Sequence, residues 1–360
     1  MFDTIDFQAL RAIGLTQALV AQMFNLQTEA SDRLMRVTEV QRDRVRLHDG
    51  HAEHIAQIWP TLRIALQIQD ESLVVGDWVA ARRDAALGDT CWVAARVPPV
   101  NHLVRRDSSG RRQALVSNVD TALLVMGAGQ DFNLRRLDRY LALVRLAGVA
   151  PLVVLSKADL CTDPAARVDA VRRHLSGQVD VLALNGLDPA SIEVLSPWLG
   201  EGQTLVLLGS SGAGKSTLTN TLTGAMGDAV QSTGGVRRGD EHGRHTTTTR
   251  SLHRCLAGAC IIDTPGLRGL QVDADEAQLD AVFDDISRLA PLCRFRDCHH
   301  EDEPGCAVRP AVPAGRLLSY HKLQREAQRH EMTVLDRHRL MAEWKARGRV
   351  AKAISRAKRG

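Results

Sequence analysis

The sequence predicts an α/β protein in which a small β-barrel precedes the α/β region and a helical, metal-binding segment follows it. Three observations lead to this fold class. Apolar runs typical of buried strands alternate with segments whose apolar residues recur at helical spacing. A glycine-rich loop stands between one such strand and a helix. Three cysteines and two histidines gather in the C-terminal part of the chain.

Length and composition set the first limits on function. The 360 residues suffice for two or three domains. No apolar run approaches the roughly 20 residues of a membrane span, and the N-terminus lacks the pattern of a secretory signal. We therefore expect a cytoplasmic protein that does not bind membranes. The seven cysteines are odd in number and mostly scattered, which argues against a disulfide framework.

The N-terminal third is expected to be helical at first and then rich in strands. Residues 1–30 resemble an amphipathic helix and its exit, whereas residues 31–112 contain short apolar runs separated by turn signals. We interpret residues 62–69 (LRIALQIQ) as a strand with Ile64, Leu66 and Ile68 on one face. Short strands at close spacing favour a small OB-like barrel, a fold that often binds RNA. The pattern does not separate it from an SH3-like barrel.

From about residue 118 the pattern of apolar residues changes to one that predicts alternating strands and helices. Residues 118–126 (NVDTALLVM) and 151–156 (PLVVLS) are typical of buried strands, and residues 132–148 between them have helical spacing. Strand, helix and strand in this order predict a βαβ unit and a parallel sheet. The same alternating pattern continues to about residue 290. It includes one apolar strand before the glycine-rich loop and another that leads to Asp263.

The glycine-rich loop matches the G-x-x-x-x-G-K-[ST] motif of nucleoside triphosphate binding. Its backbone N–H groups and the following helix N-terminus suit a phosphate. Lys215 can reach the β- and γ-phosphates, and Ser216 can bind Mg²⁺. The motif alone does not distinguish ATP from GTP. The predicted nucleotide-binding residues here are Gly209, Ser210, Ser211, Gly212, Ala213, Gly214, Lys215, Ser216 and Thr217.

An acidic residue downstream completes the metal side of this predicted site. Asp263 ends an apolar strand, where a carboxylate can hold Mg²⁺ through water. Gly266 can donate its backbone N–H to a γ-phosphate and move when that phosphate leaves. Leu267 and Arg268 follow, so the glutamine that often orients the attacking water is missing from this position. Water activation must then come from elsewhere or from a partner.

Between these motifs, residues 243–250 (GRHTTTTR) are typical of a switch loop. A threonine in this region normally completes the Mg²⁺ shell and senses the γ-phosphate. Thr246, Thr247 and Thr248 are all candidates, and we predict Thr247 as the Mg²⁺ ligand beside Ser216 and Asp263. His245 is a candidate for positioning water. A polar loop without any special threonine remains the alternative.

A guanine-reading motif is expected after the strand over 151–156. Ser156, Lys157, Ala158 and Asp159 follow that strand. A carboxylate at Asp159 can accept from N1–H and the exocyclic amine of guanine, and the stem of Lys157 can pack on the base. Asn185 begins a candidate for the next base-contacting loop, for which a plain turn is the equal alternative.

The order of these motifs is unusual. The guanine motif comes first, and the phosphate loop, the threonines and Asp263 follow. A usual GTPase places the guanine motif last. A cut in an exposed loop, with the old termini joined, preserves the contacts of a fold. The sequence therefore predicts a circularly permuted P-loop GTPase domain.

The Cys/His segment predicts a structural metal site. Its pattern is C-x₄-C-x-H-x₅-C, formed by Cys293, Cys298, His300 and Cys306. Three thiolates and one imidazole make a closed tetrahedral zinc set with no open position for catalysis. His299 is the competing ligand. The remaining tail, residues 337–360, has nine Lys and Arg against one acid; a nucleic-acid contact and a solvated helix end are equally open readings of it.

Together these motifs resemble the ribosome small-subunit-dependent GTPase A family. The segments NVDTALLV, GSSGAGKST, GRHTTT and DTPG and the zinc spacing match that family. The resemblance implies an OB-fold domain, one structural Zn²⁺, Mg²⁺ with GTP, and GTP hydrolysis stimulated by the small (30S) ribosomal subunit. It also implies contacts with 16S rRNA in late subunit maturation. Two departures are Ser156, where the family has Asn, and the missing Ser-Ala of the last base loop, which leaves the role of Asn185 open.

We therefore expect four segments and a monomer. They are a helical extension (1–30), an OB-like RNA-binding barrel (31–112), a permuted GTPase domain (113–290) and a zinc-binding, basic helical domain (291–360). Two alternatives remain: a P-loop RNA-dependent ATPase, and a non-hydrolysing zinc/OB RNA-binding module. The first lacks a signature of ATP selectivity, and the intact Lys215, Ser216 and Asp263 argue against the second.

Overall fold

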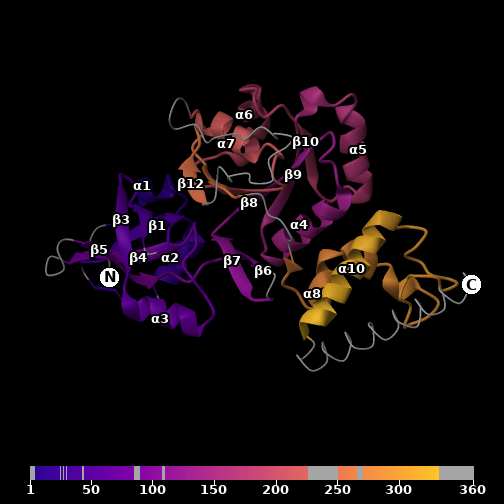
Figure 1. Cartoon of the computed structure of the whole chain (residues 1–360), viewed down its shortest axis with the longest axis horizontal. Helices are drawn as coiled ribbons and strands as arrows, with labels where there is room; N and C mark the ends of the chain where they lie inside the picture. The colour runs from indigo at the N-terminus through magenta and orange to yellow at the C-terminus, as the bar shows by residue number, and fades with distance from the viewer. Residues whose placement is uncertain are drawn as a thin grey trace, which may run out of the picture.

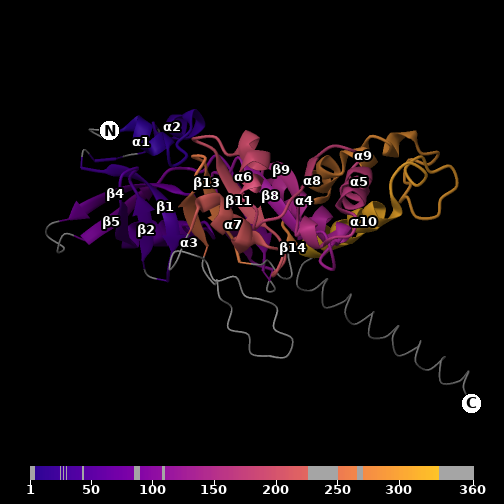
Figure 2. The same cartoon turned by 90° about the horizontal axis from the view of Figure 1, so that it is seen from above.

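The structure is a computed structural model that describes residues 5–24, 26, 28–29, 31–42, 44–84, 90–107, 110–225, 250–265 and 271–331. Figure 1 shows three parts in a row: a β-barrel, a central α/β domain and a C-terminal helical part. Seen from above, the same succession holds (Figure 2). Within the described ranges, no helix combines the length and the apolar character needed to cross a membrane.

The barrel has five strands in the order β1-β2-β3-β5-β4, and a further pairing of β1 with β4 closes it. Its interior is apolar, with Val37, Leu47, Val79 and Val93 fully buried. This closed five-stranded arrangement confirms the predicted OB-like barrel. The strands are β1 (Arg33–Val40), β2 (Val45–His48), β3 (Glu53–Ile58), β4 (Trp78–Asp84) and β5 (Thr90–Arg96).

The strand predicted over residues 62–69 is wrong, because this segment is helical. It belongs to α3 (Pro60–Ile68), which has Pro60 in its first turn. Apolar residues at every second position also include pairs that are four positions apart. Residues four apart lie on one face of a helix, so the pattern fits a helix as well as a strand. Leu62 and Leu66 form that pair and pack on the barrel core. Ile64 and Ile68 are 56% and 80% exposed.

Five parallel strands form the centre of the α/β domain, in the order β10-β9-β8-β11-β13, and β12 pairs antiparallel with β13. From β8 the chain builds outward through β9 to β10, and then starts again with β11 on the other side of β8. Such a reversal marks the place where open α/β sheets bind ligands, at the carboxyl ends of the strands. The strands are β8 (Thr121–Gly127), β9 (Ala150–Ser156), β10 (Asp180–Ala183), β11 (Thr204–Leu208), β12 (Ser251–Arg254) and β13 (Cys260–Asp263).

Helices cover both faces of this sheet, as a parallel sheet requires. Ala122, Leu124 and Met126 of β8 join the core under α4 and α5. Leu123 and Val125 point the other way and join the core under α6 and α7. The helices are α4 (Leu134–Leu146), α5 (Pro164–His174), α6 (Ala190–Leu195) and α7 (Lys215–Thr223).

Two pairings join the α/β domain to the N-terminal part of the chain. The barrel strand β1 pairs with β12 through Glu39 and Ser251, so that one sheet of eleven strands runs through both parts. The hairpin of β6 (His102–Arg106) and β7 (Arg112–Ser117) pairs instead with β14 (Gln271–Val272), at which the described chain resumes after residue 265. Both strands that follow the predicted switch segments therefore pair with N-terminal strands.

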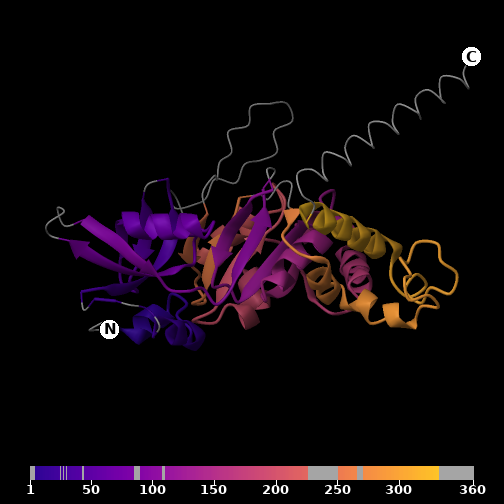
Figure 3. The same ribbon diagram turned by 90° about the horizontal axis from the view of Figure 1, so that it is seen from below.

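The N-terminal extension forms two short helices, α1 (Phe7–Arg11) and α2 (Gln17–Met23). They lie on one side of the barrel, with α3 on the opposite side (Figures 2 and 3). Arg36 of β1 is fully buried where these parts meet. Its guanidinium donates to the carbonyl of Ile13, to Thr204 Oγ1 at 2.9 Å and to the carbonyl of Asn118 at 3.1 Å. One buried side chain thus ties the extension and the barrel to the α/β domain.

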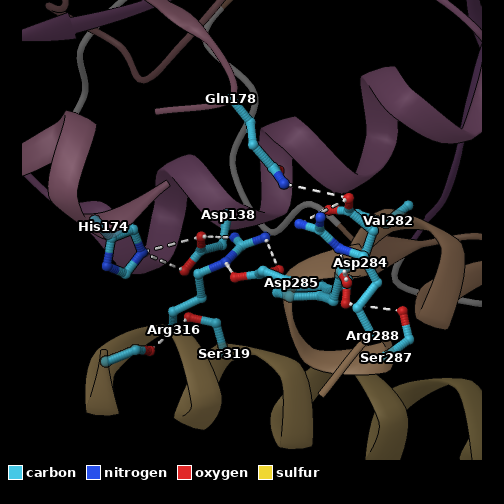
Figure 4. Close-up of polar contacts among 12 residues, drawn as sticks. Asp138, His174, Gln178, Val282, Asp284, Asp285, Ser287, Arg288, Arg316 and Ser319 are labelled. Atoms are coloured by element: carbon cyan, nitrogen blue, oxygen red, sulfur yellow. Dashed lines mark hydrogen bonds and ion pairs between the residues drawn. The ribbon is translucent and has the colours of Figure 1, made fainter. Parts of the chain in front are cut away.

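The C-terminal part packs against α4 through a buried network of charged residues (Figure 4). Arg316 donates to Asp138 at 3.0 Å and to both carboxylate oxygens of Asp285, at 2.5 and 2.8 Å. His174 lies 2.9 Å from the carboxylate of Asp138. The network joins α4 and α5 to the C-terminal helices. These are α8 (Glu276–Val282), α9 (Asp284–Ser287), the 3-10 turn η5 (Ala290–Leu292) and α10 (Ala314–Glu331).

Candidate functional site

The predicted guanine motif and the glycine-rich loop are in direct contact. They follow β9 and β11, which both pair with β8 in parallel, so their carboxyl ends lie at the same edge of the sheet. Ser156 Oγ donates to the carbonyl of Ala213 at 2.5 Å. Lys157 Nζ donates to the carbonyl of Gly212 at 2.7 Å. The two motifs therefore form one site despite their inverted order along the chain.

Glycine is required at two positions of the loop for different reasons. A Cβ on Gly209 would lie 2.2 Å from the carbonyl oxygen of Val125, so the loop approaches β8 too closely for any side chain. Gly214 has a φ of +90° and directly precedes α7. Ser211 and Gly212 are exposed, while Ala213 is buried. The loop thus turns from the strand into the helix with its outer residues open to solvent.

Lys215 is folded back over this loop. Its side chain is buried, and Nζ donates to the carbonyls of Gly209 at 3.1 Å and Ser210 at 2.9 Å. Burial lowers the pKa of Lys215, and the carboxylates of Asp263 and Asp131 oppose that shift. The ammonium is therefore already held where the loop would surround an anion.

Ser216 and Asp263 meet at the neighbouring strand ends. Asp263 ends β13, which pairs with β11, and its Oδ2 accepts from Ser216 Oγ at 3.1 Å. Its Oδ1 is buried without a hydrogen-bond partner among the described residues. Burial raises the pKa of Asp263, whereas Lys215 and the hydrogen bond from Ser216 oppose that shift. A buried carboxylate oxygen in need of a partner, beside a hydroxyl, fits a divalent cation.

Asp159 lies at the exposed rim of this site. Lys157 has a φ of 56°, in the left-handed region, and the 3-10 turn Ala158–Leu160 follows it. The Ala158 N–H donates to the carbonyl of Leu184 at 3.2 Å, which brings the end of β10 beside the motif. Asp159 is exposed in this turn, so its carboxylate is accessible to a ligand.

Asn185 follows β10 and stabilises its own turn. Its Oδ1 accepts from the Leu187 N–H at 3.0 Å, and its carbonyl accepts from Ser191 Oγ at 2.6 Å. The carbonyl of Gly186 accepts from Thr221 Oγ1 of α7 at 2.6 Å. The structure therefore places this loop beside α7, and the present contacts of the Asn185 side chain are those of a turn.

One residue that the sequence analysis did not single out belongs to this group. Asp131, in the loop between β8 and α4, accepts from Ser210 Oγ with both carboxylate oxygens, each at 2.8 Å. The one signal in the sequence is an acid shortly after a buried strand. That β8 lies next to β11 is a property of the sheet order, which the sequence does not state.

The predicted switch residues lie outside the described part of the chain. These are His245, Thr246, Thr247, Thr248 and Gly266, and their assignments stay predictions. The same holds for the basic tail over residues 337–360.

The Cys/His segment forms a compact cluster. The ligand atoms of Cys293, Cys298, His300 and Cys306 all lie within 4.8 Å of one another. Cys293 Sγ and Cys306 Sγ are 4.0 Å apart, and His300 Nδ1 lies 3.6 and 3.5 Å from them. Tetrahedral zinc would place such sulfur atoms about 3.8 Å apart and each about 3.6 Å from the nitrogen. The cluster fits a zinc ion, and it contains His300 rather than its neighbour His299.

Comparison with known proteins agrees with this geometry. Residues 97–273 match the family model of the RsgA GTPase. A small ribosomal subunit biogenesis GTPase RsgA of Mesorhizobium japonicum is 42% identical, over 86% of this chain and 88% of the relative. A protein of the same name from Xylella fastidiosa is 47% identical, over 71% of this chain and 76% of the relative.

Solved structures agree in fold. The crystal structure of YjeQ from Thermotoga maritima has a TM-score of 0.60 at 23% identity, covering 82% of this chain and 99% of that one. The crystal structure of YloQ, a circularly permuted GTPase, has a TM-score of 0.58 at 22% identity, covering 86% of this chain and 100% of that one. With the order of motifs along the sheet, this likeness confirms the predicted circular permutation. The chain belongs to the RsgA GTPase family.

Proposed function

We propose that this chain hydrolyses GTP to GDP and phosphate during maturation of the small (30S) ribosomal subunit. The observation that carries the proposal is the contact of Ser156 and Lys157 with Ala213 and Gly212, because it makes a guanine-reading motif and a phosphate loop two ends of one site. The names of the relatives supply the process.

The glycine-rich loop, residues 209–217, holds the phosphates. Its N–H groups and the N-terminus of α7 supply donors and a favourable dipole. Lys215 exchanges two carbonyl acceptors for phosphate oxygens, which accept more strongly because they are charged. The ammonium already lies within hydrogen-bonding distance of the loop carbonyls, which supports this role. No large rearrangement of the lysine is needed before a nucleotide binds.

Mg²⁺ bound with GTP is held by Ser216 and Asp263 and, by prediction, by Thr247. Asp263 Oδ1, which is buried and has no hydrogen-bond partner in the part of the chain that the structure describes, supports the metal assignment. A bound Mg²⁺ supplies neutralisation of the charge that develops on the phosphates. Thr246, Thr248, Gly266 and His245 remain the predicted switch contacts around the γ-phosphate.

The base is read by Asp159, with Lys157 packed along it and Asn185 at the adjacent loop. The exposed position of Asp159 at the rim supports this. Ser156 acts on the loop rather than on the base, since its hydroxyl is occupied by the carbonyl of Ala213. A serine thus ties the guanine motif to the phosphate loop at the position where the family has asparagine.

One structural zinc ion in the Cys/His cluster orders the segment before α10. Contacts with 16S rRNA are proposed for the barrel, the zinc domain and the basic tail, mostly to phosphates. The pairing of β12 with β1 and of β14 with β6 supports a route by which the nucleotide state alters these surfaces. We further propose that the chain acts as a monomer in four domains with the boundaries predicted above.

The test is a GTPase assay with and without purified small subunits, at two salt concentrations. Stimulation that fades with salt is expected if the contact is charge-driven. Lys215→Ala should abolish turnover, whereas Arg173→Ala, on the exposed face of α5, removes a positive charge away from the site and serves as the control. Retained subunit-stimulated hydrolysis in Lys215→Ala would contradict the proposal.

A further inference from the structure

The loop over residues 128–133 stands beside the phosphate loop, at the point where the strand order reverses. β8 leads into α4 on one face of the sheet, and the adjacent β11 leads into α7 on the other. The two loops therefore flank the crevice in which ligands of such sheets bind. Asp131 is the acidic residue of the first loop, and its carboxylate reaches across to Ser210 of the second.

The carboxylate of Asp131 is itself held from two directions. The Gly127 N–H, at the end of β8, donates to Oδ2 at 3.2 Å. Arg136, in the first turn of α4, donates to Oδ1 at 2.5 Å and also to the backbone carbonyl of Asp131. Asn133 caps the same turn by accepting from the Arg136 N–H at 3.0 Å. The acceptor for Ser210 is thus fixed to a strand end and to a helix start, both rigid elements.

Ser210 is held on its other side by the lysine of the phosphate loop. While Ser210 Oγ donates to Asp131, the carbonyl of Ser210 accepts from Lys215 Nζ at 2.9 Å. The ion pair with Arg136 offsets the charge of Asp131, so the carboxylate acts here mainly as an acceptor and repels phosphate little. The contact with Asp131 does not depend on the lysine, so it holds the first turn of the loop also when Lys215 Nζ leaves the Ser210 carbonyl for a phosphate oxygen.

We propose that Asp131 is a positioning residue for nucleotide binding: through Ser210 it holds the phosphate loop in the shape that directs its N–H groups at the phosphates. The inference rests on the proposed function and adds to it a residue outside the recognised motifs. A loop fixed before binding loses less conformational entropy when the ligand arrives. GDP and GTP should benefit alike, because neither Asp131 nor Ser210 is needed for the chemical step.

The experiment is a double-mutant cycle of Asp131→Ala and Ser210→Ala in the full chain. It measures the Kd of a fluorescent GDP analogue together with KM and kcat for GTP. Each single variant should raise Kd and KM about tenfold, in keeping with the loss of a hydrogen bond to a charged group, and leave kcat within about threefold of the original chain. The double variant should be no worse than either single one.

Asp169→Ala, on the exposed face of α5, removes the same charge without touching the loop and should change nothing. Values of Kd within about twofold for both single variants would overturn the inference, as would losses that multiply in the double variant. If Asp131→Ala does not fold, the inference is tested with Ser210→Ala alone. A rise of about tenfold in its Kd and KM supports the inference, and values within about twofold overturn it. Failure of the unaltered chain to bind GDP would instead refute the proposed function.

Discussion

The hydroxyl of Ser156, at the end of β9, lies 2.5 Å from the carbonyl oxygen of Ala213 in the loop after β11. Both groups are buried, so the hydrogen bond is shielded from water. It ties the end of one parallel strand to the loop after another, across the intervening β8. A side chain of only two heavy atoms beyond Cα therefore sets the spacing between the base end and the phosphate end of the site.

Removal of this tie should weaken nucleotide binding. Ser156→Ala leaves the buried carbonyl of Ala213 without its donor, at a cost of about 1–3 kcal/mol. We expect a rise of about tenfold in the Kd for GDP, measured by fluorescence titration, with little change in kcat at saturating GTP. Thr162→Ala, at an exposed position after the same turn, is the control. A Kd unchanged by Ser156→Ala would mean that Lys157 suffices to hold the motif.

Asp159 should determine which base binds. Asp159→Asn replaces one carboxylate oxygen by an amide N–H donor and keeps the other oxygen as an acceptor for N1–H, so guanine loses the acceptor for its exocyclic amine. Xanthine carries an oxygen in place of that amine, and this oxygen gains a donor. We expect GTP affinity to fall about ten- to a hundredfold, in keeping with the loss of a hydrogen bond to a charged group, and xanthosine triphosphate to bind better. Competition binding with GTP, xanthosine triphosphate and ATP measures both changes. Equal competition by ATP and GTP for the unaltered chain would refute the assignment of Asp159.

Local patterns predicted the strands that surround the site, because buried parallel strands have long apolar runs and end in the motifs themselves. The contact of Ser156 with Ala213 depends on the sheet order, which no local pattern states. For the same reason Asp131 was not singled out. At Leu62 and Leu66 a local pattern was present, but the prediction from it was wrong. Their spacing fits a strand and a helix equally, and packing against the barrel core favours the helix. The buried partners Asp138 and Arg316 lie in segments whose pattern predicted only helices.

The Cys/His cluster should hold one zinc ion that orders its surroundings. Cys306→Ser removes a ligand, so the zinc content should fall well below one ion per chain in elemental analysis, and a chelator should have the same effect on the original chain. Because the cluster lies apart from the phosphate loop, GDP affinity should stay the same while subunit stimulation is lost. Cys161→Ser, outside the cluster, is the control. Full zinc content in Cys306→Ser would point to a different ligand set.

Arg316 and Asp138 should hold the C-terminal helices on the α/β domain. They are 1% and 0% exposed, and Arg316 also pairs with Asp285. Arg316→Ala leaves the buried carboxylate of Asp285 without its cation and that of Asp138 with His174 as its partner, which typically costs about 3–5 kcal/mol. We expect an earlier calorimetric transition and faster proteolysis within α10, both insensitive to salt because the pair is buried.

Arg325→Ala, on the exposed face of the same helix, removes an equal charge and should leave both measurements unchanged. GDP affinity provides a further check and should stay the same, since Arg316 forms no hydrogen bond with the phosphate loop among the described residues. Arg316→Met separates two explanations of any loss. It keeps the apolar contact with the ring of Phe283, over which the guanidinium lies at 4.6 Å, but supplies no charge. If Arg316→Met were as stable as the original chain, packing on Phe283 rather than the ion pairs would hold α10 in place.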